Sequence, residues 1–308
     1  MTSDATKIKN LYPKQSRSQR FLQDAWKLIV SLLSNPLSLL AVIVLAVILI
    51  AAIAAPTIAP HDPELQSLRL RLKPPFWMAG SEAGYLFGTD ALGRDMLSRM
   101  IYGSQISLIV GISTVLLQGV LGVLIGLLSG YFGGWVDNIL MRIADIQQSI
   151  PFLILAVALA AVVRPSLINI IFVLGITGWV TYSRVVRGQV LSIREREFVE
   201  ASRALGSGNA RIIFKHILPN IVPSITVIAT LTISTMILAE ASLSFLGMGV
   251  PPPTATLGGM VADGRNYIST SWWVSVLPGI QIFITVLSIN LIGDHLREIL
   301  DPTLRNTS

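Results

Sequence analysis

Side chains that could act as nucleophiles, metal ligands or phosphate binders are scarce in this chain of 308 residues. Cysteine is absent, and the three histidines, His61, His216 and His295, are too widely separated to form an H-E-x-x-H zinc pair. The sequence also lacks a G-x-x-x-x-G-K-S/T phosphate loop and a G-x-S-x-G nucleophile elbow. We therefore expect no catalytic residue, no metal site and no cofactor.

Four polar side chains lie in segments that are otherwise largely apolar: Asp145, Gln148, Glu240 and Asn290. Charged groups at membrane depth are costly and mark functional sites by default. We expect these four residues to line a solute path. The alternative is a position near the membrane surface, where headgroups and water solvate them. They do not form the series of ionisable groups that a proton-coupled pump needs.

The densest polar cluster of the C-terminal half is EFVEASRALGSGNARIIFKHILPN, residues 197–220. In its first part, Phe198, Ala201 and Leu205 recur on one face of a predicted helix. Glu200, on the other face, is spaced to pair with the arginines four residues before it and three residues after it. The pattern predicts a short amphipathic helix with one apolar side.

Two glycines divide this segment. Gly206 is expected to end the first helix, and Gly208 to allow a sharp turn. Asn209 is then placed to cap a second short helix, and Pro219 to occupy the first turn of a following span. The prediction is a rigid helix–glycine–helix element whose apolar side binds a partner, because exposed patches of this kind commonly mark interaction sites.

The composition indicates that this element belongs to a membrane protein. Hydrophobic residues make up 52% of the chain and charged residues only 13%, and the mean hydropathy is +0.68. A helix needs about 20 apolar residues to cross the hydrocarbon core of a bilayer. Six stretches almost free of ionisable residues are long enough, and they predict an all-α polytopic membrane protein with spans near 37–59, 104–130, 139–162, 166–186, 221–246 and 273–293.

The distribution of basic residues predicts the orientation. Sixteen basic residues fall on one side of the six predicted spans and seven on the other. The positive-inside rule therefore places both termini in the cytoplasm, and the basic excess reflects topology rather than nucleic-acid binding. The predicted parts are a basic cytoplasmic segment 1–36, a first span 37–59, an extracytoplasmic segment 60–103, a five-helix core 104–294 with a cytoplasmic loop 187–220, and a cytoplasmic tail 295–308.

Two further patterns concern the second span. Asp90, Arg94 and Asp95 precede it, with charges spaced for i,i+4 pairing. They are equally compatible with a solvated face and with a structural role at the external mouth of the protein. Within the span, Gly122 and Gly126 form a small-xxx-small pattern, which predicts close approach of another helix.

The 197–220 segment resembles the EAA loop of ABC-importer permeases, whose pattern is E-A-A-x3-G-x9-I-x-L-P. The matching residues are Glu200, Ala201, Ser202, Gly206, Leu218 and Pro219. Ser202 replaces the second alanine, and His216 stands at the isoleucine position. FGTDALGRDMLSRMIYGSQISLIVG, YFGGWVDNILMRIADI, LSFLGMGVPPP and GDHLREILDP also resemble the dipeptide, oligopeptide and nickel permeases, although Gln105 replaces a usual arginine and Leu257 a usual tryptophan.

This resemblance implies a type I ABC-importer permease fold in a bacterial inner membrane, with the six matching loop residues docking on ATPases. It also implies several partners: a second, homologous permease in a heterodimer, two cytoplasmic ABC ATPases, an extracytoplasmic solute-binding protein and membrane lipid, but no nucleic acid. The expected solute is a di- or oligopeptide. The alternatives are nickel or another small solute, an ATP-independent secondary carrier, and a structural anchor.

Overall fold

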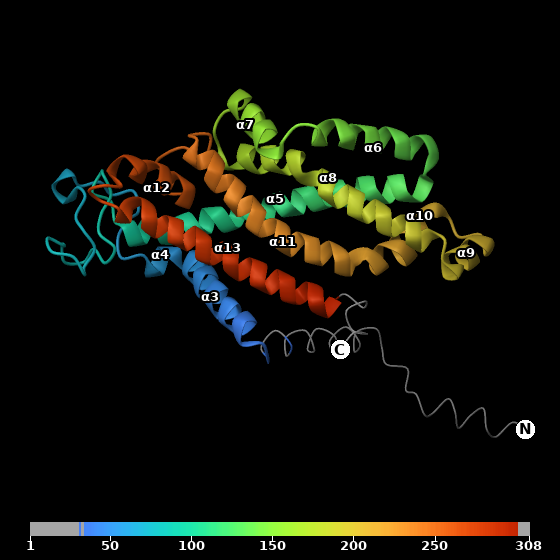
Figure 1. Ribbon diagram of the computed structural model, residues 1–308, viewed down its shortest axis with the longest axis horizontal. Helices are drawn as coiled ribbons and strands as arrows, with labels where there is room; N and C mark the ends of the chain where they lie inside the picture. Colours follow the sequence, from blue (N-terminus) through green and yellow to red (C-terminus); the bar gives the residue numbers. More distant parts are fainter. Residues whose placement is uncertain (1–30, 32–33, 301–308) are drawn as a thin grey trace, which may run out of the picture.

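The computed structural model describes residue 31 and residues 34–300, which form helices and loops with one isolated antiparallel bridge between Thr89 and Asp95. Most of the predicted basic segment 1–36 and of the predicted tail 295–308 lies outside the described residues. The molecule is elongated, and its long helices run side by side along its length (Figure 1). They are α3 (Pro36–Ile53), α5 (Met96–Phe132), α8 (Leu167–Arg194), α11 (Leu218–Phe245) and α13 (Trp273–Leu300).

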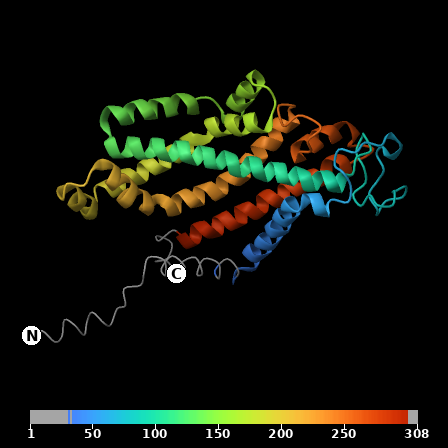
Figure 2. The same cartoon turned by 180° about the vertical axis from the view of Figure 1, so that it is seen from behind.

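Shorter elements complete the fold. They are α4 (Ala55–Ile58), α6 (Gly134–Gln148), α7 (Phe152–Val162), α9 (Glu197–Ala204), α10 (Asn209–Arg211), α12 (Leu257–Gly264), the 3-10 turns Leu68–Leu70 and Arg265–Tyr267, and a π-helical segment Ile212–Ile217. The loop 60–95 lies with α12 at one end of the molecule, and α9 and α10 lie at the other (Figures 1 and 2). Helices α6 and α7 lie along one side, next to α8.

In the described part of the chain, five helices are long and apolar enough to cross a membrane, and α6 with α7 would be a sixth span if the bent pair counts as one. The prediction of an all-α polytopic protein with about six spans is therefore confirmed. The span expected over 139–162 is not one continuous helix, because α6 and α7 meet at an angle of 86°. Pro151 has no N–H to donate and disfavours helical backbone at Ile150, so the helix breaks there.

Two other predicted spans have different limits in the structure. The span over 37–59 is divided at Ala54 between α3 and α4, because Pro56 cannot donate the next helical hydrogen bond. The second span begins earlier than expected: α5 starts at Met96, where the Asp95 carboxylate accepts a hydrogen bond from Ser98 N at 2.8 Å. Residues 96–103, which the prediction placed before the span, are therefore part of its helix.

Glycines allow α5 and α8 to pack closely, as the small-xxx-small pattern predicted. A Cβ atom added at Gly122 would lie 2.4 Å from the carbonyl oxygen of Trp179, and one at Gly126 would lie 2.6 Å from that of Ser183. Small residues allow membrane helices to approach until their backbones are in van der Waals contact. Among the described residues, α5 and α8 form the most extensive helix pair; α6, α7 and α11 pack against this pair, whereas α13 packs mainly on α11, α12 and α3.

Candidate functional site

The 197–217 element stands at the end of the molecule opposite to loop 60–95 (Figure 2). Its inner face packs on the ends of α5 and α8, where Val199 and Ile212 are fully buried in an apolar cluster with Val190. The hydroxyl of Tyr131 donates a hydrogen bond to Asn209 Oδ1 at 2.9 Å. These contacts fix the element to the membrane helices, so it is a rigid part of the fold.

The element exposes three large apolar side chains, two of which the helical spacing predicted. The side chain of Leu205 is 87% exposed, that of Phe214 is 57% exposed and that of Phe198 is 41% exposed. Ala201 is also exposed. Three large apolar side chains on one small projection are unusual for a surface in contact with water, and they indicate a docking site for another protein.

A Schellman motif ends α9. Gly206 has φ +77°, its N–H donates to Arg203 O at 2.9 Å, and Ser207 N donates to Ser202 O at 3.1 Å. This confirms that Gly206 ends the first helix. The left-handed backbone there favours glycine and turns the chain toward α10.

Other details of the element differ from the prediction. Asn209 is the first residue of α10 rather than its cap, and Gly208 occupies the cap position. Helix α10, the π-helical segment and α11 form one continuous rod from Asn209 to Phe245, so no separate second helix exists. Glu200 forms no ion pair with any of the described residues, and its carboxylate is exposed. Of the other matching residues, Ser202 is buried, Leu218 is half-buried and Pro219 is exposed.

At the opposite end, Asp90 organises a buried group of charges. Its carboxylate accepts hydrogen bonds from Arg94 Nε at 2.6 Å and from the backbone N–H groups of Leu92 and Arg94 at 2.8 and 3.0 Å. Arg99 Nε lies 3.4 Å from the same carboxylate. Asp90, Arg94, Asp95 and Arg99 are all buried, so the solvated-face alternative is wrong and these residues hold the loop against α5.

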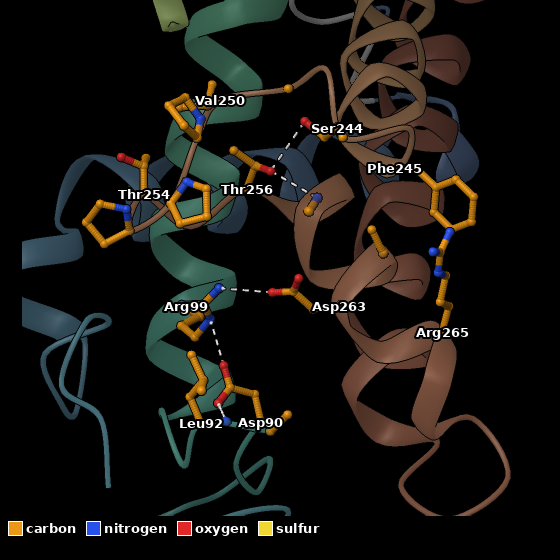
Figure 3. A pocket seen from close by; sticks show the side chains of 18 of the residues that line it. Asp90, Leu92, Arg99, Ser244, Phe245, Val250, Thr254, Thr256, Asp263 and Arg265 are labelled. Atoms are coloured by element: carbon orange, nitrogen blue, oxygen red, sulfur yellow. Dashed lines mark hydrogen bonds and ion pairs between the residues drawn. The ribbon is translucent and has the colours of Figure 1, made fainter. Parts of the chain in front are cut away.

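Asp263 of α12 joins this group from a distant part of the chain. Its carboxylate lies 3.6 Å from Arg94 and 3.9 Å from Arg99, and all three side chains line a cavity of about 780 Å³ (Figure 3). Burial raises the pKa of the Asp263 carboxyl, and the positive charges of Arg99 and Arg94 oppose that rise. The group therefore connects loop 60–95, α5 and α12.

We expect Asp90→Ala to lower the stability of the protein by about 3 to 5 kcal/mol, because it leaves two buried guanidinium groups without their shared carboxylate. The thermal unfolding midpoint of the detergent-solubilised protein would measure this effect. The matched control is Glu82→Gln, which removes an ion pair with Lys73 whose two side chains are 45% and 35% exposed. An exposed pair contributes about 0 to 1 kcal/mol, so equal losses for the two variants would contradict the assignment.

The four polar residues predicted for a solute path do not form one cluster. Asp145 pairs with Arg184 at 2.6 Å on the exposed side of α6 and α8, in agreement with the alternative that water reaches it. Glu240 is fully buried and accepts hydrogen bonds from the hydroxyls of Ser107 and Ser244 at 3.1 and 2.7 Å. The geometry does not test whether these two acids line a solute path.

The two predicted amides have different surroundings. Asn290 accepts a hydrogen bond from Ser234 at 2.5 Å between α11 and α13. Gln148 lines a cavity of about 460 Å³ together with Gln118 of α5, a residue that sequence analysis missed. The only available signal for Gln118 was an amide within the long uncharged stretch of α5, which also contains Gln105.

Comparison with known proteins identifies the family. Residues 122–306 match the family described as binding-protein-dependent transport system inner membrane component. The chain belongs to this family. Residues 20–75 also match the N-terminal transmembrane domain of oligopeptide transport permease C. The chain is therefore the membrane component of a binding-protein-dependent transport system, in agreement with the resemblance of its 197–220 segment.

Curated relatives of this permease match it over most of their length. It is 42% identical to the di/tripeptide transport system permease protein DppC of Pseudomonas aeruginosa (strain UCBPP-PA14), over 93% of this chain and 94% of the relative. It is 41% identical to the probable D,D-dipeptide transport system permease protein DdpC of Escherichia coli (strain K12), over 90% and 91%. It is also 41% identical to the oligopeptide transport system permease protein OppC of Bacillus subtilis (strain 168), over 88% and 87%.

A solved structure supports the permease fold. An inward-facing conformation of the MetNI methionine ABC transporter has a chain that superposes with a TM-score of 0.54 and 25% sequence identity. The match covers 66% of this permease and 97% of that chain. The predicted ABC-importer permease fold is thereby confirmed.

Proposed function

We propose that this permease imports di- or oligopeptides across a bacterial inner membrane, using ATP hydrolysis on two cytoplasmic ATPase subunits. A second, homologous permease completes the channel, and an extracytoplasmic binding protein delivers the peptide. Both termini and the 197–217 element lie in the cytoplasm, where positive charge is favoured. The names of the three relatives above support a peptide rather than nickel as the solute.

The observation that carries this proposal is the exposed apolar face of the 197–217 element, formed by Phe198, Leu205 and Phe214. In the proposal, this face docks on an ATPase. The element continues without a break into α11, so a displacement of the face by closing ATPases moves α11 as a rod. Access to the path between the permeases then alternates between the two sides of the membrane.

Removing the most exposed apolar side chain tests the docking. We expect Leu205→Asp to reduce recovery of the ATPases more than about tenfold when the tagged permease is purified from its membrane in mild detergent, because a charge replaces the centre of the apolar contact. Mass spectrometry of the purified complex would identify two phosphate-loop ATPases and a second permease with the wild-type chain. Leu68→Asp is the matched control, since Leu68 is 74% exposed at the opposite end.

Two outcomes would contradict the proposal. Equal recovery of ATPases with Leu205→Asp and Leu68→Asp would show that the exposed face does not bind them. Transport by the isolated chain in vesicles with an ion gradient and no ATPase would identify an ATP-independent carrier instead.

A further inference from the structure

A cavity of about 460 Å³ with an uncharged lining, mostly apolar, lies where α6 and α7 meet, between these two helices, α5, α8 and α11. Four elements contribute amides or hydroxyls to its wall: Gln118 from α5, Gln148 from α6, Thr181 from α8, and Thr232 and Thr235 from α11. Among the described residues that line it, none is charged. Its volume is within the range of sites that hold small ligands, about 300 to 1,000 Å³.

Gln118 is the buried polar group of this wall. Its side chain is 1% exposed, and its Nε2 donates a hydrogen bond to Leu174 O at 2.9 Å. Its Oε1 has no hydrogen-bond partner in the part of the chain that the structure describes. An unpaired buried amide oxygen costs about 1 to 3 kcal/mol. The oxygen itself is shielded from the cavity, so a donor in the cavity reaches it when the amide turns toward the open space.

Gly178 makes room for this amide. A Cβ atom at Gly178 would lie 2.1 Å from Gln118 Nε2, so any other residue would displace the side chain of Gln118 from the wall. The amide is therefore accommodated by the packing of α8 on α5. A leucine would have filled this place without an unpaired polar atom.

The neighbouring glutamines of α6 have different roles. Gln147 Nε2 donates to Thr177 O at 2.8 Å, and its Oε1 accepts from Trp179 Nε1 at 2.8 Å, so its polar atoms hold α6 on α8. Gln148 is exposed and faces the cavity without such contacts among the described residues. Of the two, Gln148 is the residue that is available to a ligand.

We propose that this cavity binds the peptide bonds of the solute during passage, and that Gln118 turns its amide so that a solute N–H donates to Oε1. This inference rests on the proposed function and names the chemistry of the solute path. The cavity recognises the amide groups of the peptide and does not recognise the charge of its side chains. A neutral wall holds no counter-charge that could retain a charged solute, and passage requires binding that is weak enough for release. Peptides with acidic, basic and neutral side chains then pass through the same site.

Charges placed at Gln148 test this proposal in the assembled transporter, reconstituted in vesicles with its ATPases and binding protein. We expect Gln148→Glu to lower the uptake of alanyl-glutamate relative to alanyl-lysine by about tenfold, and Gln148→Lys to shift the ratio in the opposite direction, because a charge a few ångströms from the solute acts on it through a medium of low dielectric constant. Gln105→Glu is the matched control. It makes the same change on α5 outside the cavity, and we expect the wild-type ratio.

A second variant tests the acceptor itself. We expect Gln118→Leu to reduce the uptake of both dipeptides at least about tenfold, because the donor of the solute loses its partner in the cavity. Stimulation of ATP hydrolysis by the peptide-loaded binding protein should persist, which separates this site from the coupling of the subunits.

The outcomes distinguish the two proposals. Unchanged uptake ratios in both Gln148 variants would overturn the assignment of the cavity, whereas the importer function would stand as long as peptide-loaded binding protein stimulates ATP hydrolysis. Absence of that stimulation in the wild-type transporter would refute the proposed function itself. If a Gln148 variant does not reach the membrane, Thr235→Asp and Thr235→Lys make the same comparison from α11, and unchanged ratios there would equally overturn the assignment.

Discussion

Gly206→Pro is expected to abolish peptide uptake while the permease remains in the membrane. Proline requires φ near −65°, whereas Gly206 has φ +77°, and the substitution also removes the N–H that donates to Arg203 O. A local cost of about 3 kcal/mol corresponds to a loss of about a hundredfold in the population of the correct turn. Helix α9 then no longer presents Phe198 and Leu205 to the ATPase.

The matched control for this prediction is Gly208→Pro. Gly208 has φ −68° and ψ 154°, a backbone conformation that proline adopts without strain, and no neighbouring atom lies within 4 Å of an added Cβ. Uptake of radiolabelled dipeptide by cells, normalised to the amount of permease in the membrane, measures both variants. Similar uptake by the two proline variants would show that the turn at Gly206 does not position the element.

Gly126→Leu is expected to prevent formation of the folded permease. A side chain at this position would meet Ser183 O at 2.6 Å and Val186 Cβ at 2.7 Å, so α8 would have to separate from α5 along its length. Because one contact is a backbone carbonyl, rotamer changes cannot relieve the clash. We expect a loss of more than about 3 kcal/mol, at the upper end of overpacking costs.

Gly188→Leu provides the comparison for Gly126→Leu. Gly188 lies on α8, is exposed, and has no atom within 4 Å of an added Cβ. The amount and homogeneity of protein in size-exclusion chromatography of detergent-solubilised membranes, together with the thermal unfolding midpoint, would measure both variants. If Gly126→Leu behaves like Gly188→Leu, the close approach of α5 and α8 at this glycine does not stabilise the fold.

Local patterns were sufficient to predict most of the helices and one functional element. Long apolar stretches predict spans because a membrane segment must satisfy its backbone hydrogen bonds internally, and a helix does so within one segment. The spacing of Phe198, Ala201 and Leu205 predicted an exposed apolar face on α9, and Gly206 predicted its end. These features depend on residues within a few positions of one another.

Interactions between residues that are close in sequence were harder to predict where tertiary packing determines their surroundings. Asp90 and Arg94 had the spacing of a solvated pair, but the packing of loop 60–95 against α5 and α12 buries them, with the more exposed Asp263 carboxylate 3.6 Å from Arg94. Pro151 accounts for the break in the span predicted over 139–162, but the 86° angle between α6 and α7 depends on how each helix packs on its neighbours. In both cases the same local pattern is compatible with several tertiary environments.

The sequence by itself determined that this protein is polytopic and helical with a glycine-ended projection, because length, apolarity and turn chemistry act locally. Its resemblance to importer permeases added the function. Only the tertiary structure decided which polar groups meet. Gln118 and Gln148 line one cavity because Gly178 leaves room for the Gln118 amide between α5 and α8, and because the last turn of α6 packs on α8 beside it. Helix packing selects the buried face of every helix at once, so no single segment contains the information that places these amides together.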